Sequence, residues 1–555
     1  MIPLHRLSRL VPLLVVAGVV ALVVRVARSP LPAGAAVGEV GEEVSSLAEP
    51  IEQINRAFAQ HWKQAELTPA PAASDLQVLR RLSLALLGTI PSLEEIRQFE
   101  ADTRPDRLEH WTRRLLADRR FAYYFSERLA RSFVGKEEGQ FVIFRRDRFV
   151  NWLSEELQRN TPYDELVRKM IAATGLWTGK PATNFVTAAV NDNDIDENKL
   201  AGKSVRAFLG QRIDCAQCHD HPFAAWKQHQ FEGLAAFYGQ VQTSLVGIED
   251  KSRRDGEPVE YRVEDRKTLE ERVVPAAVPF HPEWLPEDGA RRERLAQWIT
   301  HPENRRFERA IANRVWALLF GRALHEPVDD LPDPDDEAPG VLDILGADFR
   351  RHGCDLRRLI QVIAASRPFR LGSDAEPPTE SAESSLGQEL ASLRRAESEW
   401  AVFPLIRLRP EQVIGSVRQS AALQTADYDS HWLLRTVRLL QEAEFVRDYG
   451  DLGENELHDR GGTIPQRLLM LNGERARESS RTSPMSAAGR IAAMASTDAS
   501  CVETAYLVCL SRRPTPEESE HFVSLLAGAR GNPRAQIVED LIWTLYQSTE
   551  FSWNH

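Results

Sequence analysis

The chain has 555 residues, which is long enough for more than one hydrophobic core and favours two domains. Hydrophobic residues make up 43% and charged residues 27% of it, a composition typical of a folded globular protein rather than a disordered or polytopic membrane protein. The formal net charge of −12 argues against a nucleic-acid partner, because such binding needs a concentrated positive surface.

The N-terminus has the pattern of an export signal. Arg6 and Arg9 precede an apolar run over residues 10–24, and small residues at 33–35 offer a cleavage site. We therefore predict that residues 1–29 are a signal peptide or an uncleaved membrane anchor, and both alternatives stay open. Either one places the body outside the cytoplasm, in the periplasm, membrane-anchored or secreted.

Signals of helix formation recur along the rest of the chain. A hydroxyl residue stands three positions before a carboxylate at Ser92, Thr161 and Thr515, which predicts helix starts there. Apolar residues recur at helical spacing from Phe307 to Leu319 and stop at Gly321, which predicts a helix that packs one face into a core. The sequence therefore predicts a mainly α fold with little β structure.

The domain order follows from changes in composition along the chain. Short β-like runs at 259–263 and 273–278 lie in a polar, charge-alternating stretch, and residues 373–385 are rich in Glu, Ser and Pro. We interpret the first stretch as a connector and the second as a surface loop. The predicted order is a tether over 30–73, with a short helix at 51–64, a helical domain over 74–242, a connector over 243–290 and a second helical domain over 291–555.

The sharpest chemical feature is the run Cys215-Ala-Gln-Cys218-His219. Two thiols separated by two residues can add to the two vinyl groups of one haem, and the adjacent His219 is then held under the iron as a ligand. The predicted export agrees with this interpretation, because c-type haem is attached outside the cytoplasm. The sequence therefore predicts a covalent haem c on Cys215, Cys218 and His219.

Nearby histidines leave other interpretations open. His221 and His229 could join the two cysteines in a tetrahedral zinc site, or one of them could be a second axial ligand of haem. The cysteine pair could also be a disulfide or a dithiol, although a thioredoxin-type pair would need βαβ surroundings. The remaining cysteines, Cys354, Cys501 and Cys509, are interpreted as buried apolar residues or one additional disulfide.

A second polar cluster is the acidic stretch from His325 to Glu337. Its carboxylates could bind Ca²⁺ or act as an acid/base pair, but the spacing does not match a calcium-binding loop. We interpret this stretch as a solvated acidic loop. Common enzyme signatures are absent from the sequence, so whether the protein is an enzyme stays open.

Several longer strings resemble known families. Residues 81–91, 160–167 and the string Cys-Ala-Gln-Cys-His-Asp-His-Pro-Phe at 215–223 resemble a planctomycete-type family, the cytochrome-c-like domain of unknown function 1549. Residues 304–330, 462–466 and 511–517 resemble its usual partner, the domain of unknown function 1553. The resemblance covers nearly everything after Ser74 and implies a cytochrome-like role for residues 74–242.

Together these observations predict an exported protein that binds one covalent haem and transfers electrons to an unknown redox or envelope partner. It would be held at the membrane through the N-terminal segment if that segment is uncleaved. The alternative is a non-redox scaffold, or an envelope- or polysaccharide-binding protein, whose Cys/His cluster holds zinc or is structural. A hydrolase that uses the acidic stretch is a third possibility.

Overall fold

The computed structural model describes residues 41–136, 144–191, 194–251, 259–264, 269–335, 338–374, 386–425, 442–451, 453, 457 and 462–555. The chain divides into two compact units, residues 1–48 and residues 49–555. The predicted signal or anchor segment, residues 1–29, lies outside the described part, as do residues 375–385 of the predicted surface loop. Among the helices that are described, none combines the length and apolar composition needed to cross a membrane.

The first half of the described chain is almost entirely helical. Its α-helices are α2 (Gly41–Gln64), α3 (Asp75–Leu87), α4 (Leu93–Ala101), α5 (Arg107–Ala117), α6 (Arg119–Val134), α7 (Arg146–Gln158), α8 (Tyr163–Ile171), α9 (Asn184–Thr187), α10 (Glu197–Phe208) and α11 (Gln228–Ala235). Two 3₁₀ turns, η1 (Pro181–Thr183) and η2 (Asp214–Gln217), lie between them.

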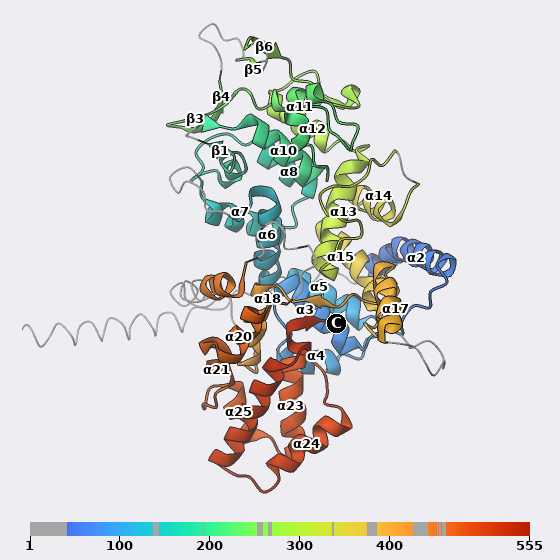
Figure 1. The fold of residues 1–555 in the computed structure, drawn as a ribbon, viewed down its shortest axis with the longest axis vertical. Coiled ribbons are helices and arrows are strands. Elements are labelled where there is room, and N and C mark those ends of the chain that lie inside the picture. Colours follow the sequence, from blue (N-terminus) through green and yellow to red (C-terminus); the bar gives the residue numbers. More distant parts are fainter. Residues whose placement is uncertain are drawn as a thin grey trace, which may run out of the picture. The chain divides into compact units, whose positions relative to one another are not determined.

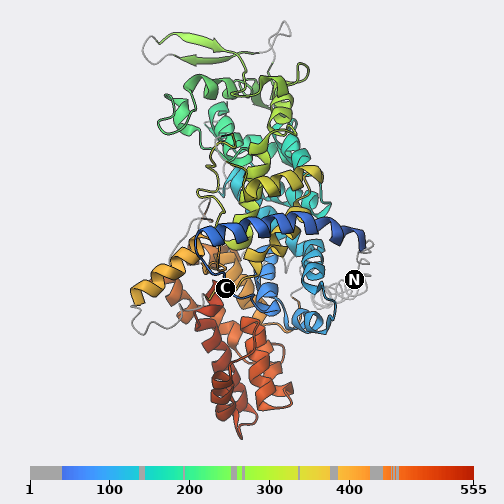
Figure 2. The ribbon, with the colours of Figure 1, turned by 90° about the vertical axis from the view of Figure 1, so that its right-hand side faces the viewer.

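The β structure in the described residues consists of four two-stranded antiparallel sheets. The pairs are β1 (Val190–Asn191) with β2 (Asp194–Ile195), β3 (Val241–Ser244) with β4 (Gly247–Asp250), β5 (Tyr261–Glu264) with β6 (Glu271–Val274), and β7 (Ile406–Arg407) with β8 (Trp553–Asn554). The β5–β6 ribbon overlaps the β-like runs predicted in the connector, and Figure 2 shows it as two adjacent arrows.

The second half returns to helices, which confirms the mainly α prediction. They are α12 (Arg291–Ile299), α13 (Arg305–Phe320), α14 (Val341–Arg351), α15 (Leu356–Ala365), α16 (Arg367–Arg370), α17 (Leu386–Ser398), α18 (Pro410–Ser420), α20 (Ile464–Asn472), α21 (Glu474–Ser480), α22 (Ala487–Met494), α23 (Asp498–Leu510), α24 (Pro516–Leu526) and α25 (Asn532–Gln547). Residues 442–449 are helical as well. The 3₁₀ turns are η3 (Pro282–Trp284) and η5 (Glu550–Ser552).

Helix α13 is a central element of the core. It contacts α3, α10, α14 and α15, so segments of both predicted domains pack together in the unit formed by residues 49–555 (Figure 1). The helix ends at Gly321 as predicted, with φ of 80° there. The prediction of a single buried face is wrong, because every residue from Arg306 to Phe320 is buried. Trp316, for example, stacks on Phe320 with ring centroids 4.4 Å apart.

Helices begin at all three predicted starts, and two of the three predicted caps are confirmed. Ser92 and Thr515 are N-caps whose side chains accept the backbone N–H three residues ahead. Thr161 does not cap α8, whose N-cap position is Pro162. Its hydroxyl instead donates to the carboxylate of Glu156 at 2.8 Å. A buried carboxylate from the preceding helix thus competes for the hydroxyl that the local pattern assigned to a cap.

All five cysteines lie in the described residues, and none of them forms a disulfide. Cys501 and Cys509 are fully buried on α23 in the C-terminal core, as predicted for apolar residues. Cys354 is half-buried, and burial raises the pKa of its thiol to about 12. These three thiols are therefore structural, and the two exposed cysteines are those of the motif.

Candidate functional site

A tight turn positions the cysteine motif after α10. Gly210 adopts φ of 62°, a conformation that favours glycine. A Cβ at this position would lie 3.1 Å from both Ala310 and Leu331, so the turn packs closely against α13 and the segment that follows it. The backbone N–H of Leu331 also donates to the carbonyl of Gly210 at 2.7 Å. The start of the motif is therefore fixed by residues a hundred or more positions away in the sequence.

The cysteines lie on the short turn η2 and just after it. Ala216, between them, is fully buried and anchors the turn, while Cys215 and Cys218 are exposed. The carboxylate of Asp214 pairs with Arg206 of α10 at 2.6 Å. Two thiols are thus presented to solvent on a turn held by a buried alanine and an ion pair. We call residues 214–227 the motif loop.

The two histidines of the motif loop are in opposite hydrogen-bonding states. Nδ1 of His219 lies 2.7 Å from the backbone carbonyl oxygen of Asp220, which can only accept, so this nitrogen carries the proton. The neutral ring then has its lone pair on Nε2, the arrangement of a metal-ligating histidine. Nδ1 of His221 accepts the backbone N–H of Phe223 at 3.2 Å, so the neutral His221 ring carries its proton on Nε2.

Asp220 closes the motif loop onto α11. Its carboxylate accepts the backbone N–H of Gln228 at 3.0 Å and pairs with Lys227 at 3.1 Å. These two contacts lower the pKa of the Asp220 carboxyl, so it stays ionised beside the start of the helix. His229, the remaining predicted ligand, is exposed on α11.

A cavity of about 670 Å³ adjoins the motif loop, and we call it the Cys218 cavity. Cys218 and His219 line it together with residues of α10, α11 and the β5–β6 ribbon. Most of the lining is polar, including the buried Glu232, whose carboxylate binds Arg272 at 2.5 Å. The nucleophilic thiol and the basic nitrogen therefore share an open, polar space.

A second cavity of about 540 Å³ involves the other part of the motif loop. We call it the aromatic cavity, since Phe223, Trp226 and Phe280 are in its lining. His325 also lines it, and its buried Nδ1 has no hydrogen-bond partner among the described residues. The buried Asn313 of α13 holds the backbone of His325 through both amide atoms, at 2.8 and 2.9 Å.

Spacing in the sequence did not reveal that His221 and His325 share a cavity, because they are far apart along the chain.

The acidic stretch was predicted as a separate, solvated loop. In the structure Asp329 pairs with Arg212 of the segment that leads into the motif at 2.7 Å, and Asp333 pairs with Arg306. These contacts modify the prediction in part, since Asp329 and Asp333 are half-buried in ion pairs, while Glu326, Asp330 and Asp335 are exposed as a solvated loop predicts.

The structure does not assemble the predicted zinc site. Within the ranges it describes, no group of three or more His, Cys, Asp or Glu side chains could hold a metal ion. This also applies to the described part of the acidic stretch, whereas Asp336 and Glu337 lie outside it. Among the candidate ligands, His219 has an Nε2 lone pair that is available to bind a metal, because its Nδ1 carries the proton. A zinc site and a second axial ligand of haem stay predictions.

The fold and the motif loop define a mainly helical protein in which a cysteine–histidine turn is held against a second helical segment. Residues 53–243 match the family PSCyt2, a protein of unknown function (DUF1549), and residues 291–427 match PSD1, a protein of unknown function (DUF1553). The two family models thus match successive parts of the chain, in the predicted order. No curated protein and no solved structure matches the chain.

Proposed function

We propose that this protein is an exported cytochrome-c-like protein that carries one covalent haem and transfers electrons to a partner protein. The observation that carries the proposal is the His219–Asp220 contact next to two exposed thiols. That contact fixes the ring and leaves the Nε2 lone pair of His219 available for a metal. Export is supported by the sequence of residues 1–29.

The residues of the motif loop fit this cofactor in their donor set. Each of Cys215 and Cys218 would form a thioether by adding its S–H bond across one vinyl group of the porphyrin, and His219 would bind the iron through Nε2. A volume of about 670 Å³ beside Cys218 and His219 is available for a group of this size. When bound, haem supplies one-electron redox chemistry.

The polar lining of the Cys218 cavity affects the reduction potential that we expect for the haem. Glu232 and Glu264 are in the lining, and carboxylates together with solvent favour the more positively charged ferric state. We therefore expect the haem at this site to have a lower reduction potential than a haem enclosed in an apolar pocket. Spectroelectrochemical titration of the haem-loaded protein measures this potential directly.

The decisive experiment is expression in a strain that attaches c-type haem, followed by a pyridine haemochrome spectrum and denaturing electrophoresis with a haem stain. The expected result is one haem per chain that stays bound after denaturation. Cys215→Ser and Cys218→Ser should each lose one thioether, which shifts the haemochrome band. Cys354→Ser is the matched control, because this half-buried cysteine lies outside the motif.

The competing zinc interpretation is tested on the same samples by elemental analysis. A folded protein with no covalent haem and with stoichiometric zinc would overturn the proposal. A folded protein with neither cofactor would favour a structural role for the cysteine pair.

A further inference from the structure

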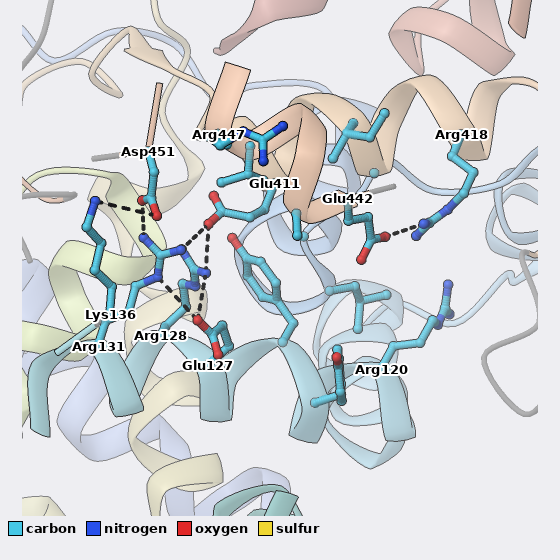
Figure 3. A pocket seen from close by; sticks show the side chains of 18 of the residues that line it. Arg120, Glu127, Arg128, Arg131, Lys136, Glu411, Arg418, Glu442, Arg447 and Asp451 are labelled. Carbon is cyan, nitrogen blue, oxygen red and sulfur yellow. Dashed lines mark hydrogen bonds and ion pairs between the residues drawn. The ribbon is translucent and has the colours of Figure 1, made fainter. Parts of the chain in front are cut away.

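Two cavities are lined without the residues proposed to hold haem, and their polar groups are in different states. The larger, of about 710 Å³, is crossed by ion pairs: Arg131 binds Glu411 and Asp451, both at 2.6 Å (Figure 3). Arg418 of the same lining pairs with Glu442. These charges satisfy one another and have a structural role. In the aromatic cavity, by contrast, buried polar atoms remain without hydrogen-bond partners among the described residues.

Gln211 is the clearest of these groups in the aromatic cavity. It follows the turn at Gly210, lines the cavity and is only 7% exposed. Its buried side-chain Oε1 has no hydrogen-bond partner among the described residues. The buried Nδ1 of His325, which lines the same cavity, is in the same state. Buried polar groups of this kind are costly to the fold, so two of them at one cavity indicate a function for that cavity.

His221 adds a third polar side chain to this lining. Its Nδ1 accepts the backbone N–H of Phe223, so the neutral ring has a donor at Nε2. The cavity thus has one amide and two imidazoles. Turning the amide over, or moving a ring proton between the two nitrogens, exchanges a donor for an acceptor. A hydroxyl group both donates and accepts, so it is the ligand group that matches these side chains in each of their states.

The charged residues of the aromatic cavity favour a neutral ligand. They are two arginines and two aspartates, Arg212, Arg306, Asp330 and Asp333. Their charges balance, and Arg306 already pairs with Asp333 and lies 4.1 Å over the ring of Phe280. With its histidines neutral, the lining therefore has no net charge to attract an ion.

Two aromatic rings of the motif loop add an apolar surface. Phe223 is 94% exposed and Trp226 is half-buried, and both line the aromatic cavity. The backbone N–H of His221 donates to the carbonyl of Trp226 at 2.8 Å and closes the loop that carries the two rings. Aromatic rings placed in this way can pack against the C–H face of a sugar ring.

We propose that the aromatic cavity binds a neutral saccharide. Its hydroxyl groups bond to the side chains of Gln211, His221 and His325. Its apolar C–H face packs on Trp226, with Phe223 at the rim. The volume of about 540 Å³ lies within the range of roughly 300–1,000 Å³ that is usual for small-molecule sites. The proposed electron transfer does not use this cavity.

The first test concerns stability and needs no choice of sugar. Gln211→Leu removes the unpartnered amide and keeps an apolar side chain of similar size. In the absence of sugar, the full-length variant should therefore unfold at a higher urea concentration than the wild type. Gln361→Leu is the control, because the Gln361 amide donates to the carbonyl of Arg357 at 3.3 Å, and it should not raise the midpoint. An unchanged or lower midpoint for Gln211→Leu would overturn the proposal.

The second test measures binding to the purified full chain by isothermal titration calorimetry. The probes are three neutral disaccharides, maltose, cellobiose and N,N′-diacetylchitobiose, with the anion glucuronate and the apolar molecule indole for comparison. At least one disaccharide should bind more tightly than both comparison molecules, with little dependence on salt, because the lining is uncharged overall. Binding of none of the disaccharides, or tighter binding of glucuronate or indole, would overturn the proposal.

Variants locate the saccharide in the aromatic cavity. Gln211→Leu and Trp226→Ala should each weaken binding of the best disaccharide about tenfold, the effect of losing one hydrogen bond or one stacking surface. Trp543→Ala removes an exposed tryptophan of α25 outside the cavity and should leave binding unchanged. Unchanged binding by folded Gln211→Leu and Trp226→Ala proteins would contradict the proposal. If Trp226→Ala does not fold, Phe223→Ala, at an exposed ring, decides.

Discussion

Nδ1 of His219 lies 2.7 Å from the backbone carbonyl oxygen of Asp220. The next histidine, His221, uses its own Nδ1 as an acceptor for the N–H of Phe223. The two neutral rings therefore differ at Nε2. This atom has a lone pair in His219 and carries the proton in His221. This difference separates the one histidine suited to bind a metal from its neighbour.

The first prediction compares these two histidines in protein made in a strain that attaches c-type haem. His219→Ala should reduce the haem content strongly or change the Soret and visible bands, since the iron loses its protein ligand. His221→Ala should leave the haem content and spectrum close to those of the wild type. The pyridine haemochrome assay and absorption spectra measure both. Equal effects of the two substitutions would contradict the assignment.

The second prediction concerns the turn that positions the motif. Gly210→Ala should lower the free energy of unfolding by more than the 1–2 kcal/mol that is roughly the cost of a left-handed residue, because its Cβ also crowds Ala310 and Leu331. Gly353→Ala is the matched control, since Gly353 has φ of 67° and no atom within 4 Å of an added Cβ. Urea unfolding of both variants checks this, and equal losses would show that packing at Gly210 is unimportant.

A third prediction concerns Arg81, which is fully buried in α3. Its guanidinium donates to the carbonyls of Phe369 at 2.9 Å, Leu371 at 2.7 Å and His555 at 2.8 Å. Arg81→Ala leaves these buried acceptors without donors and opens a cavity, so we expect a loss of about 3 kcal/mol or more. Chemical denaturation measures the loss. Arg530→Ala at an exposed site should change the stability little, and a comparably small effect at Arg81 would contradict the prediction.

The fourth prediction is a dependence of stability on pH. Burial in α13 raises the pKa of the Glu308 carboxyl from 4.5 to about 7, in spite of the nearby Arg350. The folded state binds this proton more tightly than the unfolded state does. The protonated carboxyl therefore makes its full contribution to the free energy of unfolding below pH 4.5, and this contribution is lost as the pH rises to about 7. Glu308→Gln removes this dependence.

Unfolding free energies at pH 5 and pH 8 check the effect of Glu308. The decrease in the free energy of unfolding from pH 5 to pH 8 should be smaller in Glu308→Gln than in the wild type, by an amount on the order of 3 kcal/mol. Glu539→Gln, on the C-terminal helix α25, should retain the wild-type decrease. An unchanged pH dependence in Glu308→Gln would show that the carboxyl is already ionised at pH 5 in the folded protein.

Local patterns in the sequence determined the secondary structure and the chemistry of the motif. The cap at Ser92, the cap at Thr515 and the stop at Gly321 are correct because each depends on hydrogen bonds or backbone angles within a few residues. The thiols and imidazole of the motif likewise follow from residue type alone. Thr161 fails as a cap because Glu156, a competing partner, is close in space.

The tertiary structure decided which of these groups meet and in what state. Residues of α13 and the following segment pack against Gly210 and pair with Arg212, and the same part of the chain brings His325 into the cavity of His221. Such contacts depend on how whole helices pack, and no periodicity or spacing within one segment encodes them. The sequence by itself therefore determined the helices and the donor atoms, while packing between distant helices decided the burial and the cavities.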